Sequence, residues 1–315
     1  MQKRYSLKPD PIDPRDFLFK PMKATAVVSL PDKVDLRQNL SPIVDQLSLG
    51  SCTSNAIVSG LREYQLIKDG RPLTRLSRLF HYWKEREIEG TINEDSGAYI
   101  RDGMKVLQQV GCSPESLWPY IESKFRDQPS EEATARAGEF KIAEYHRVIS
   151  YDDMLAALAQ EQPVVLGISI YNSFESSTVR NTGMIPVPDT TKETFLGGHA
   201  ILACGYQTFS DGIQYVLVRN SWGTAWGQFG YGWIPKSFFT QGFVTDMWTG
   251  TAEINPEKMT FKEALDILIK EKQILNGYDY WVNFETRLHA GTLTYDDYQF
   301  VPLVFQKFAA YLKNN

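Results

Sequence analysis

Cysteine is scarce in this sequence, and its three copies lie far apart. The 315-residue chain contains only Cys52, Cys112 and Cys204. This odd number, without close pairs, is not typical of a disulfide framework or of a structural zinc site. We therefore expect reduced thiols and no metal or organic cofactor. Reduced thiols favour a reducing compartment, which predicts a cytoplasmic protein.

Long apolar runs and basic clusters are absent as well. No run reaches the length of a membrane span, and residues 1–17 lack the apolar centre of a secretory signal. The formal net charge is −5, from 33 basic and 38 acidic side chains. This balance predicts neither membrane insertion nor a nucleic-acid partner. Hydrophobic residues make up 43% of the chain, enough for a large core in two lobes.

Cys52 stands at the predicted start of a long helix. Gly50 and Ser51 form a small-residue turn before it, and apolar residues behind it recur at helical spacing until Asp69 and Gly70. The unpaired N–H groups and the positive dipole end of a helix N-terminus favour a thiolate. The position therefore predicts a lowered thiol pKa, although a small buried apolar cysteine is the commoner explanation of such a stretch.

Two later stretches supply partners for a nucleophilic cysteine. His199 opens an apolar run that predicts a buried strand, and Asn220 ends another strand just before Trp222 and several glycines. The two residues follow Cys52 by 147 and 168 positions. Cysteine, histidine and asparagine make the thiol version of a nucleophile, a general base and a group that orients the base. The sequence thus predicts nucleophilic catalysis by Cys52.

These motifs resemble those of the papain-like cysteine peptidases. The resemblance covers about residues 34–233 and rests on Gln46, GSC at 50–52, GH at 198–199 and NSWGTAWGQFGYG at 220–232. It implies an α+β, two-lobed papain-like fold. The helical lobe, at about 40–125, would carry the cysteine, and a β-rich, barrel-like lobe, at about 140–250, would carry the histidine and asparagine.

The resemblance implies a role for each matching residue. Cys52 would be the nucleophile, His199 the general base and acid, and Asn220 the group that orients the imidazole. The side-chain amide of Gln46 would join the Cys52 N–H in an oxyanion hole. Trp222 would shield the His199–Asn220 bond from water.

The resemblance also implies a substrate cleft between the lobes. The residues that would contact the substrate are Gly97, Ala98, Tyr99, Ile100, Gly198, Ala200 and Trp222. Gly97 and Ala98 occupy the place of a glycine pair whose backbone binds the substrate. A pocket wall of Ile100 and Ala200 would favour apolar side chains, although Ile100 fits a plain core position equally well.

Some features depart from the pattern or extend it. Thr53 and Leu49 stand where the family usually has an aromatic residue and a half-cystine, which removes a disulfide and changes the packing. In the helical lobe, we expect a second helix from about Leu76 and a third capped by Asp95 or Ser96.

The two ends of the chain flank a predicted catalytic domain at 31–250. Residues 1–30 are proline-rich and predict an arm that is either strapped along the lobes or laid across the cleft as a short pro-segment. In the second case, Phe17, Leu18 and Phe19 would fill the pocket. Residues 251–315 predict a helical extension that packs on the β-rich lobe or binds a protein partner.

The predicted function is hydrolysis of peptide bonds in proteins or peptides, through a Cys thiolate/His imidazolium pair and a thioester. Two alternatives use the same residues differently. Acyl transfer to an amine, as in a peptide ligase or a crosslinking enzyme, would need the same triad. A protein-binding module that keeps the fold without turnover is the alternative from another class.

Overall fold

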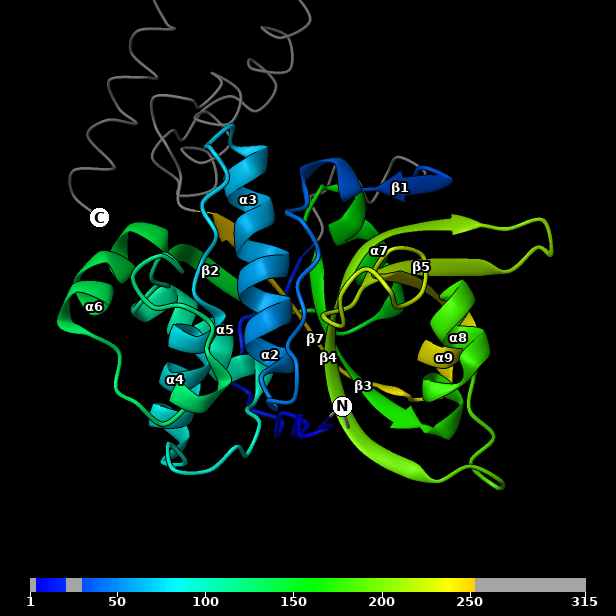
Figure 1. The fold of residues 1–315 in the computed structure, drawn as a ribbon. Coiled ribbons are helices and arrows are strands. Elements are labelled where there is room, and N and C mark those ends of the chain that lie inside the picture. The colour runs from blue at the N-terminus through cyan, green and yellow to red at the C-terminus, as the bar shows by residue number, and fades with distance from the viewer. Residues whose placement is uncertain (1–3, 21–29, 253–315) are drawn as a thin grey trace, which may run out of the picture. The chain divides into compact units, whose positions relative to one another are not determined.

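The computed structural model describes residues 4–20 and 30–252 (Figure 1). The chain divides into two compact units, residues 1–253 and 254–315. The predicted C-terminal helical extension and its partner therefore lie outside the described residues. In the part of the chain that is described, no helix is long and apolar enough to cross a membrane.

The helix that begins at Cys52 stands between the other helices and the sheet (Figure 1). It is made of α2 (Cys52–Ser54), the π-helical segment η2 (Asn55–Arg62) and α3 (Glu63–Lys68), and it ends at Asp69 and Gly70 as predicted. The π-helical winding was not predicted; such segments are rare and are often found at functional sites. We call these three segments together the nucleophile helix.

Further helices complete the helical lobe: α4 (Arg78–Glu89), α5 (Ile100–Gln109), α6 (Glu131–Ala137), and the short turns η1 (Arg37–Asn39), η3 (Glu122–Lys124) and η4 (Gly138–Phe140). The prediction that Asp95 or Ser96 caps the third helix is wrong, because α5 begins at Ile100. The Asp95 carboxylate is engaged elsewhere. It accepts hydrogen bonds from the Gly50 N–H and the Tyr82 hydroxyl.

Seven strands form one antiparallel sheet in the described residues: β1 (Lys33–Asp35), β2 (Ile142–Arg147), β3 (Val164–Tyr171), β4 (Phe195–Thr208), β5 (Gln214–Arg219), β6 (Tyr231–Pro235) and β7 (Val244–Ala252). Their order is β2-β7-β3-β4-β5-β6, and β1 pairs with β4. Short helices surround the sheet: α7 (Tyr151–Ala159), η5 (Asn172–Glu175), α8 (Ser177–Thr182) and α9 (Lys236–Thr240).

The nucleophile helix packs against β4 at the centre of the contact between the lobes, and α5 packs against β2 and β7. Gly60 lies at the first of these contacts, where an added Cβ would come within 3.1 Å of Leu202 on β4. Ile57, Val58 and Leu61 on the helix are fully buried. The fold is therefore the predicted α+β architecture, with Cys52 in the helical lobe and His199 on the sheet.

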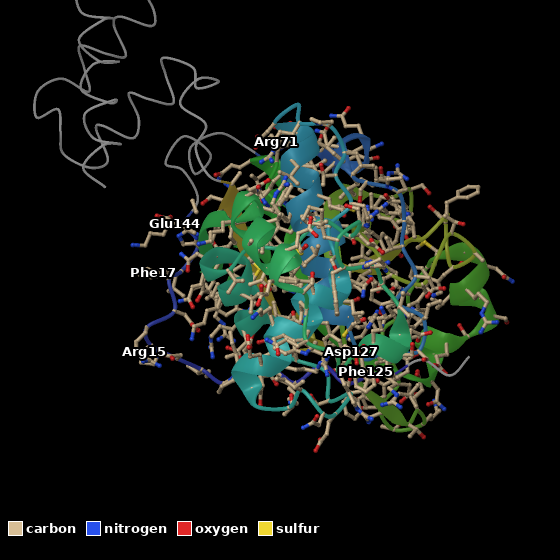
Figure 2. All side chains as sticks on the ribbon, turned by 60° about the vertical axis from the view of Figure 1, so that its left-hand side comes forward. Arg15, Phe17, Arg71, Phe125, Asp127 and Glu144 are labelled. Atoms are coloured by element: carbon tan, nitrogen blue, oxygen red, sulfur yellow. The ribbon has the colours of Figure 1, made fainter. Side chains whose placement is uncertain are left out.

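The N-terminal arm, residues 4–20, packs along both lobes. Its first residues lie beneath the start of α2, near β4 (Figure 1). Farther along, the Phe19 N–H donates to the Arg147 carbonyl, and the Arg147 N–H donates to the Phe17 carbonyl. Phe17 is 76% exposed, and Figure 2 shows it and Arg15 projecting outward.

The prediction that Phe17, Leu18 and Phe19 fill the cleft is therefore wrong. Their backbone pairs with the end of β2, and Leu18 is 44% exposed. Only Phe19 is buried. The apolar character of this stretch gave no information about where along the arm the chain would cross the cleft.

Arg219 ties the end of β5 to the loop that leads into the active site. Its buried guanidinium donates to the carbonyls of Ser41 and Pro42 and to the Ser41 hydroxyl. Burial lowers the pKa of Arg219. Because the next residue is Asn220, this clamp fixes the distance between the loop and the predicted triad.

Replacing Arg219 should destabilise the fold because it leaves several buried hydrogen-bond acceptors without their donor. We expect Arg219→Met to lower the free energy of unfolding by about 2–4 kcal/mol, measured by urea denaturation. Arg180→Met is the control, since Arg180 is exposed on α8; it should change that free energy by less than about 0.5 kcal/mol. Equal losses in the two variants would contradict the clamp.

Candidate active site

His199 lies on β4, Asn220 directly follows the neighbouring strand β5, and their side chains form a direct hydrogen bond. Nε2 of His199 lies 2.9 Å from Oδ1 of Asn220. The same oxygen accepts the Ser221 N–H at 2.8 Å. An amide oxygen can only accept, so Nε2 carries the proton, and Nδ1 is left to exchange a proton with a reacting group. This is the geometry expected of an oriented general base.

Cys52 faces the same strand from the N-terminus of the nucleophile helix. Its side chain is fully buried, and the backbone N–H of Ala200, the residue after His199, interacts with its sulfur. Burial raises the pKa of the Cys52 thiol to about 12, and the charge of Glu85 adds to this shift. The predicted lowering of that pKa is not seen in this structure, because loss of water outweighs the N–H groups around the sulfur.

Gln46 is held beside this pair by a residue that the sequence analysis missed. Its side-chain oxygen accepts the Ser221 hydroxyl at 2.6 Å, and its Nε2 donates to the Leu49 carbonyl at 3.0 Å. The Gln46 N–H also donates to the Ser221 carbonyl. Ser221 thus fixes Gln46 while its own N–H holds Asn220. Its place directly after Asn220 was the available signal.

Aromatic rings surround the imidazole. The Trp222 ring lies 5.2 Å from the His199 ring, tilted by 35°. Phe174 meets Trp222 edge-on at 5.4 Å, and Tyr5 of the arm lies 6.1 Å from His199. Trp222 thus lies where it can shield the His199–Asn220 bond. Phe174 and Tyr5 were not predicted, because neither belongs to a recognisable motif.

The arm crosses the cleft at Tyr5, Ser6 and Leu7. Ser6 pairs in parallel with Gly198, and the Leu7 N–H donates to the Gly198 carbonyl at 3.1 Å. On the other wall, a Cβ added to Gly97 would lie 2.0 Å from the Ser6 carbonyl oxygen. The residues at positions 97 and 198, one on each wall, therefore have to be glycine for the arm to pass. The arm occupies backbone positions that were predicted to bind substrate.

The other predicted substrate-contacting residues lie nearby. The Gly97 N–H donates to the Tyr82 hydroxyl at 3.1 Å. Ala98 and Ala200 are buried. Ile100 is fully buried and belongs to the hydrophobic core, so its role in a substrate pocket stays a prediction.

A buried polar cluster, which we call the Asp10 latch, holds the arm just beyond the cleft. Asp10 accepts hydrogen bonds from Trp248 Nε1 at 2.7 Å and from the Arg101 N–H at 3.3 Å. Its own N–H donates to Asp246 at 3.2 Å, and Asp246 pairs with Arg147. Burial raises the pKa of Asp10 to about 7, and the charge of Asp246 contributes to the increase.

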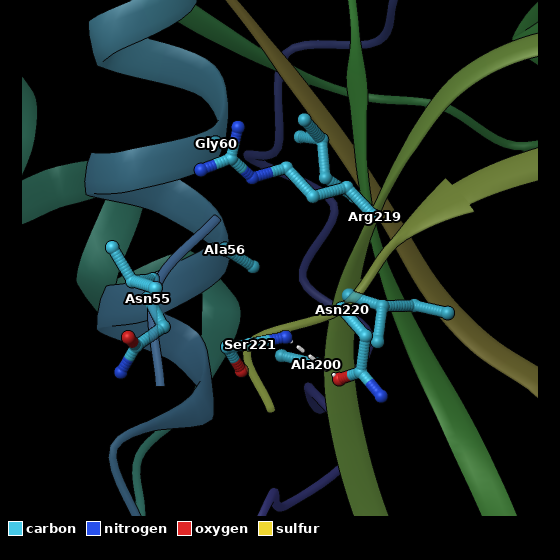
Figure 3. Close-up of a pocket in the computed structure, with 10 residues that line it drawn as sticks. Asn55, Ala56, Gly60, Ala200, Arg219, Asn220 and Ser221 are labelled. Carbon is cyan, nitrogen blue, oxygen red and sulfur yellow. Dashed lines mark hydrogen bonds between the residues drawn. The ribbon is translucent and has the colours of Figure 1, made fainter. Parts of the chain in front are cut away.

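A small cavity lies behind the site, between the nucleophile helix and strands β4 and β5 (Figure 3). Its lining residues are Val44, Asn55, Ala56, Gly60, Ala200, Ile201, Leu202, Arg219, Asn220 and Ser221. Figure 3 shows the hydrogen bond from the Ser221 N–H to the Asn220 oxygen at its edge. The cavity adjoins the group that orients His199.

Comparisons with known proteins agree with this geometry. The family model of the papain family cysteine proteases matches residues 30–247. An uncharacterized peptidase C1-like protein of Acanthamoeba polyphaga mimivirus is 36% identical over 240 residues, 73% of this chain and 76% of that protein. A cathepsin L-like proteinase of Fasciola hepatica is 27% identical over 209 residues, 64% of this chain and 60% of that protein.

Solved structures lead to the same family. The crystal structure of xylellain, a cysteine protease from Xylella fastidiosa, matches with a TM-score of 0.72 and 36% identity. The match covers 81% of this chain and 99% of xylellain. Together with the family match over most of the chain, this shows that the protein belongs to the papain family of cysteine peptidases.

Proposed function

We propose that the protein hydrolyses peptide bonds of protein or peptide substrates with Cys52 as nucleophile and His199 as base. The observation that carries this proposal is the His199–Asn220 hydrogen bond at 2.9 Å, which leaves Nδ1 for proton exchange with the thiol. Cys52 lies against Ala200, the residue that follows His199 in the chain. A nucleophile, a base and an orienting group are thus brought together by three separate elements.

The reaction begins when the Cys52 proton passes to His199 Nδ1. The thiolate sulfur attacks the carbonyl carbon of the scissile bond, and the carbonyl oxygen becomes an oxyanion. The Cys52 N–H and a hydrogen of the Gln46 amide stabilise this charge. The carbon–nitrogen bond then breaks as His199 gives its proton to the leaving amine. Water, deprotonated by the same imidazole, hydrolyses the resulting thioester and restores the thiol.

The arm belongs to this function as an inhibitor. It uses the Gly198 carbonyl and passes directly over Gly97, so the arm and a substrate chain compete for one channel. Cys52 is fully buried while the arm is docked, and this burial raises the pKa of its thiol, so the thiol stays protonated. Departure of the arm would open the channel and rehydrate the sulfur, which lets the helix N-terminus and His199 lower the thiol pKa.

The proposal predicts one reactive thiol. A peptidyl epoxide should add once to the folded protein, at Cys52, as mapped by mass spectrometry. Cys52→Ala should lose this adduct and reduce kcat/KM on a peptide substrate by about 10⁴-fold or more. Cys112→Ala and Cys204→Ala are the controls and should retain both signals. Comparable labelling of Cys112 or Cys204, or amine release without hydrolysis of the acyl group, would contradict the proposed hydrolysis by Cys52.

Removing the crossing segment should activate the enzyme. Deletion of residues 1–9 takes away Tyr5, Ser6 and Leu7, so Cys52 should be alkylated faster and kcat/KM on a short peptide should rise, by about tenfold or more. Deletion of residues 1–3 is the matched control and should change neither rate. If the longer deletion yields a folded protein with unchanged rates, the arm is a structural strap.

Arm docking should weaken as the pH rises. The pKa of Asp10 is raised from its ordinary 3.8 to about 7 in the docked state, so docking takes up a proton. The resulting stabilisation is full below about pH 4 and is lost as the pH rises to about 7. In Asp10→Asn the side chain stays neutral and keeps an acceptor for Trp248.

The measurement is the ratio of Cys52 alkylation rates, wild type over Asp10→Asn, at each pH. Because both proteins carry the same Cys52 thiol, the ratio removes the effect of thiol ionisation on the alkylation rate. It should increase between pH 5 and 7, by about tenfold or more, and be constant above pH 7.5. A ratio that does not change with pH would show that docking of the arm leaves the pKa of Asp10 unchanged.

A further inference from the structure

A lysine of the arm occupies a shaped cation site on the wall of the cleft. Nζ of Lys8 lies 2.9 Å from Oε2 of Glu89, whose side chain is 5% exposed. The other carboxylate oxygen of Glu89 accepts the Tyr99 N–H at 2.8 Å. The same ammonium lies 5.2 Å from the centre of the Tyr99 ring. The site therefore has a fixed carboxylate and an aromatic face for one positive charge.

The position of Glu89 in the fold favours a cation there whether or not the arm is docked. Glu89 is the last residue of α4, and Gly90 caps the helix in a left-handed conformation. The C-terminal end of a helix carries partial negative charge, so a carboxylate there is unfavourable without a positive partner. When Lys8 leaves, the carboxylate and the helix end together attract another cation.

The cleft geometry shows which part of a substrate would reach this site. Tyr5 contacts His199 and Trp222, and His199 must protonate the leaving amine, so Tyr5 marks the leaving-group side. Leu7 and Lys8 extend to the opposite side, where the acyl part of a substrate lies. Lys8 is two residues beyond Ser6, which crosses the cleft at Gly97 and Gly198.

We propose that Glu89 and Tyr99 form a specificity subsite that takes a lysine or arginine side chain of the substrate, two to four residues before the scissile bond. This inference rests on the proposed peptidase function and names its substrate class: peptides with a basic residue on the acyl side. Lys8 fills the subsite in the arm-covered enzyme and thereby imitates the substrate. The alternative is that Glu89 serves only to fasten the arm.

The test uses the full-length protein and pairs of peptides that carry either lysine or the uncharged norleucine at one position. Lysine is placed in turn at the second, third and fourth residue before the cleaved bond. Both peptides of a pair compete for the same arm-free fraction of enzyme. The ratio of their kcat/KM values is therefore independent of how often the arm leaves.

We expect the lysine peptide to be preferred at one of the three positions by about tenfold. Glu89→Gln keeps an oxygen for the Tyr99 N–H but loses the charge, and it should reduce the ratio to about one. Tyr99→Leu keeps the backbone donor and should reduce the preference in part. Glu87→Gln, an exposed acid on the same helix that pairs with Lys84, is the matched control and should keep the full preference.

Two outcomes would overturn the subsite. One is cleavage without lysine preference at any of the three positions, and the other is a preference that survives Glu89→Gln. In either case peptide cleavage and Cys52 labelling persist, so the proposed function stands. If no peptide is cleaved and Cys52 is not labelled, the proposed function itself fails, and this inference fails with it.

Discussion

The contact between the nucleophile helix and β4 is the constraint on which the site depends. Cys52 and His199 lie on different lobes, and they can react only if the helix packs closely against the strand. Gly60 allows that approach at Leu202, and the loop before the helix is tied to β5 by Arg219 and to Asn220 by way of Ser221 and Gln46. A small shift of one lobe against the other would therefore change the distance between Cys52 and His199.

The arm connects burial to chemistry in this enzyme. With the arm docked, Cys52 and Asp10 are both buried, and burial raises the pKa of both groups. The docked state consequently holds protons that the open state releases. Under the proposed inhibition by the arm, protonation, arm docking and a silent thiol belong to one state of the molecule, and the opposite properties to the other.

The sequence predicted the elements with strong patterns and missed those that depend on tertiary contacts. The nucleophile helix and its end at Asp69 and Gly70 followed from apolar spacing and a turn signal. The pairing of His199 with Asn220 followed from motifs. The start of α5 was wrong because Asp95, a good capping residue by type, binds Gly50 and Tyr82 instead. A local rule cannot detect such a distant partner.

The arm shows the same limit of prediction from local sequence patterns. The proline content predicted an ordered arm. The apolar stretch at residues 17–19 predicted that Phe17 fills the substrate pocket, but the Phe17 side chain is exposed. The residues that cross the cleft, Tyr5 and Ser6, are unremarkable in sequence. They fit because Gly97 and Gly198 leave room for backbone and because Glu175 accepts the Tyr5 hydroxyl. Fit of this kind is a property of two distant surfaces and has no local pattern.

The replacement of an aromatic residue by Thr53, directly after the nucleophile, has a structural counterpart. The Thr53 hydroxyl donates to Glu85 Oε2 at 2.8 Å, and Oε1 of Glu85 lies 3.3 Å from Nδ1 of His81. Nε2 of His81 lies 3.0 Å from the Gly103 carbonyl on α5. All three side chains are fully buried. This polar chain fastens the first turn of the nucleophile helix to α4 and α5, where Leu49 and Thr53 leave neither a disulfide nor an aromatic contact.

That fastening has an electrostatic consequence for the reaction. The charge of Glu85 raises the pKa of Cys52, whereas the helix N-terminus favours the thiolate. The two effects act on the same sulfur with opposite sign. Position and reactivity of the nucleophile are thus set by one buried group of residues.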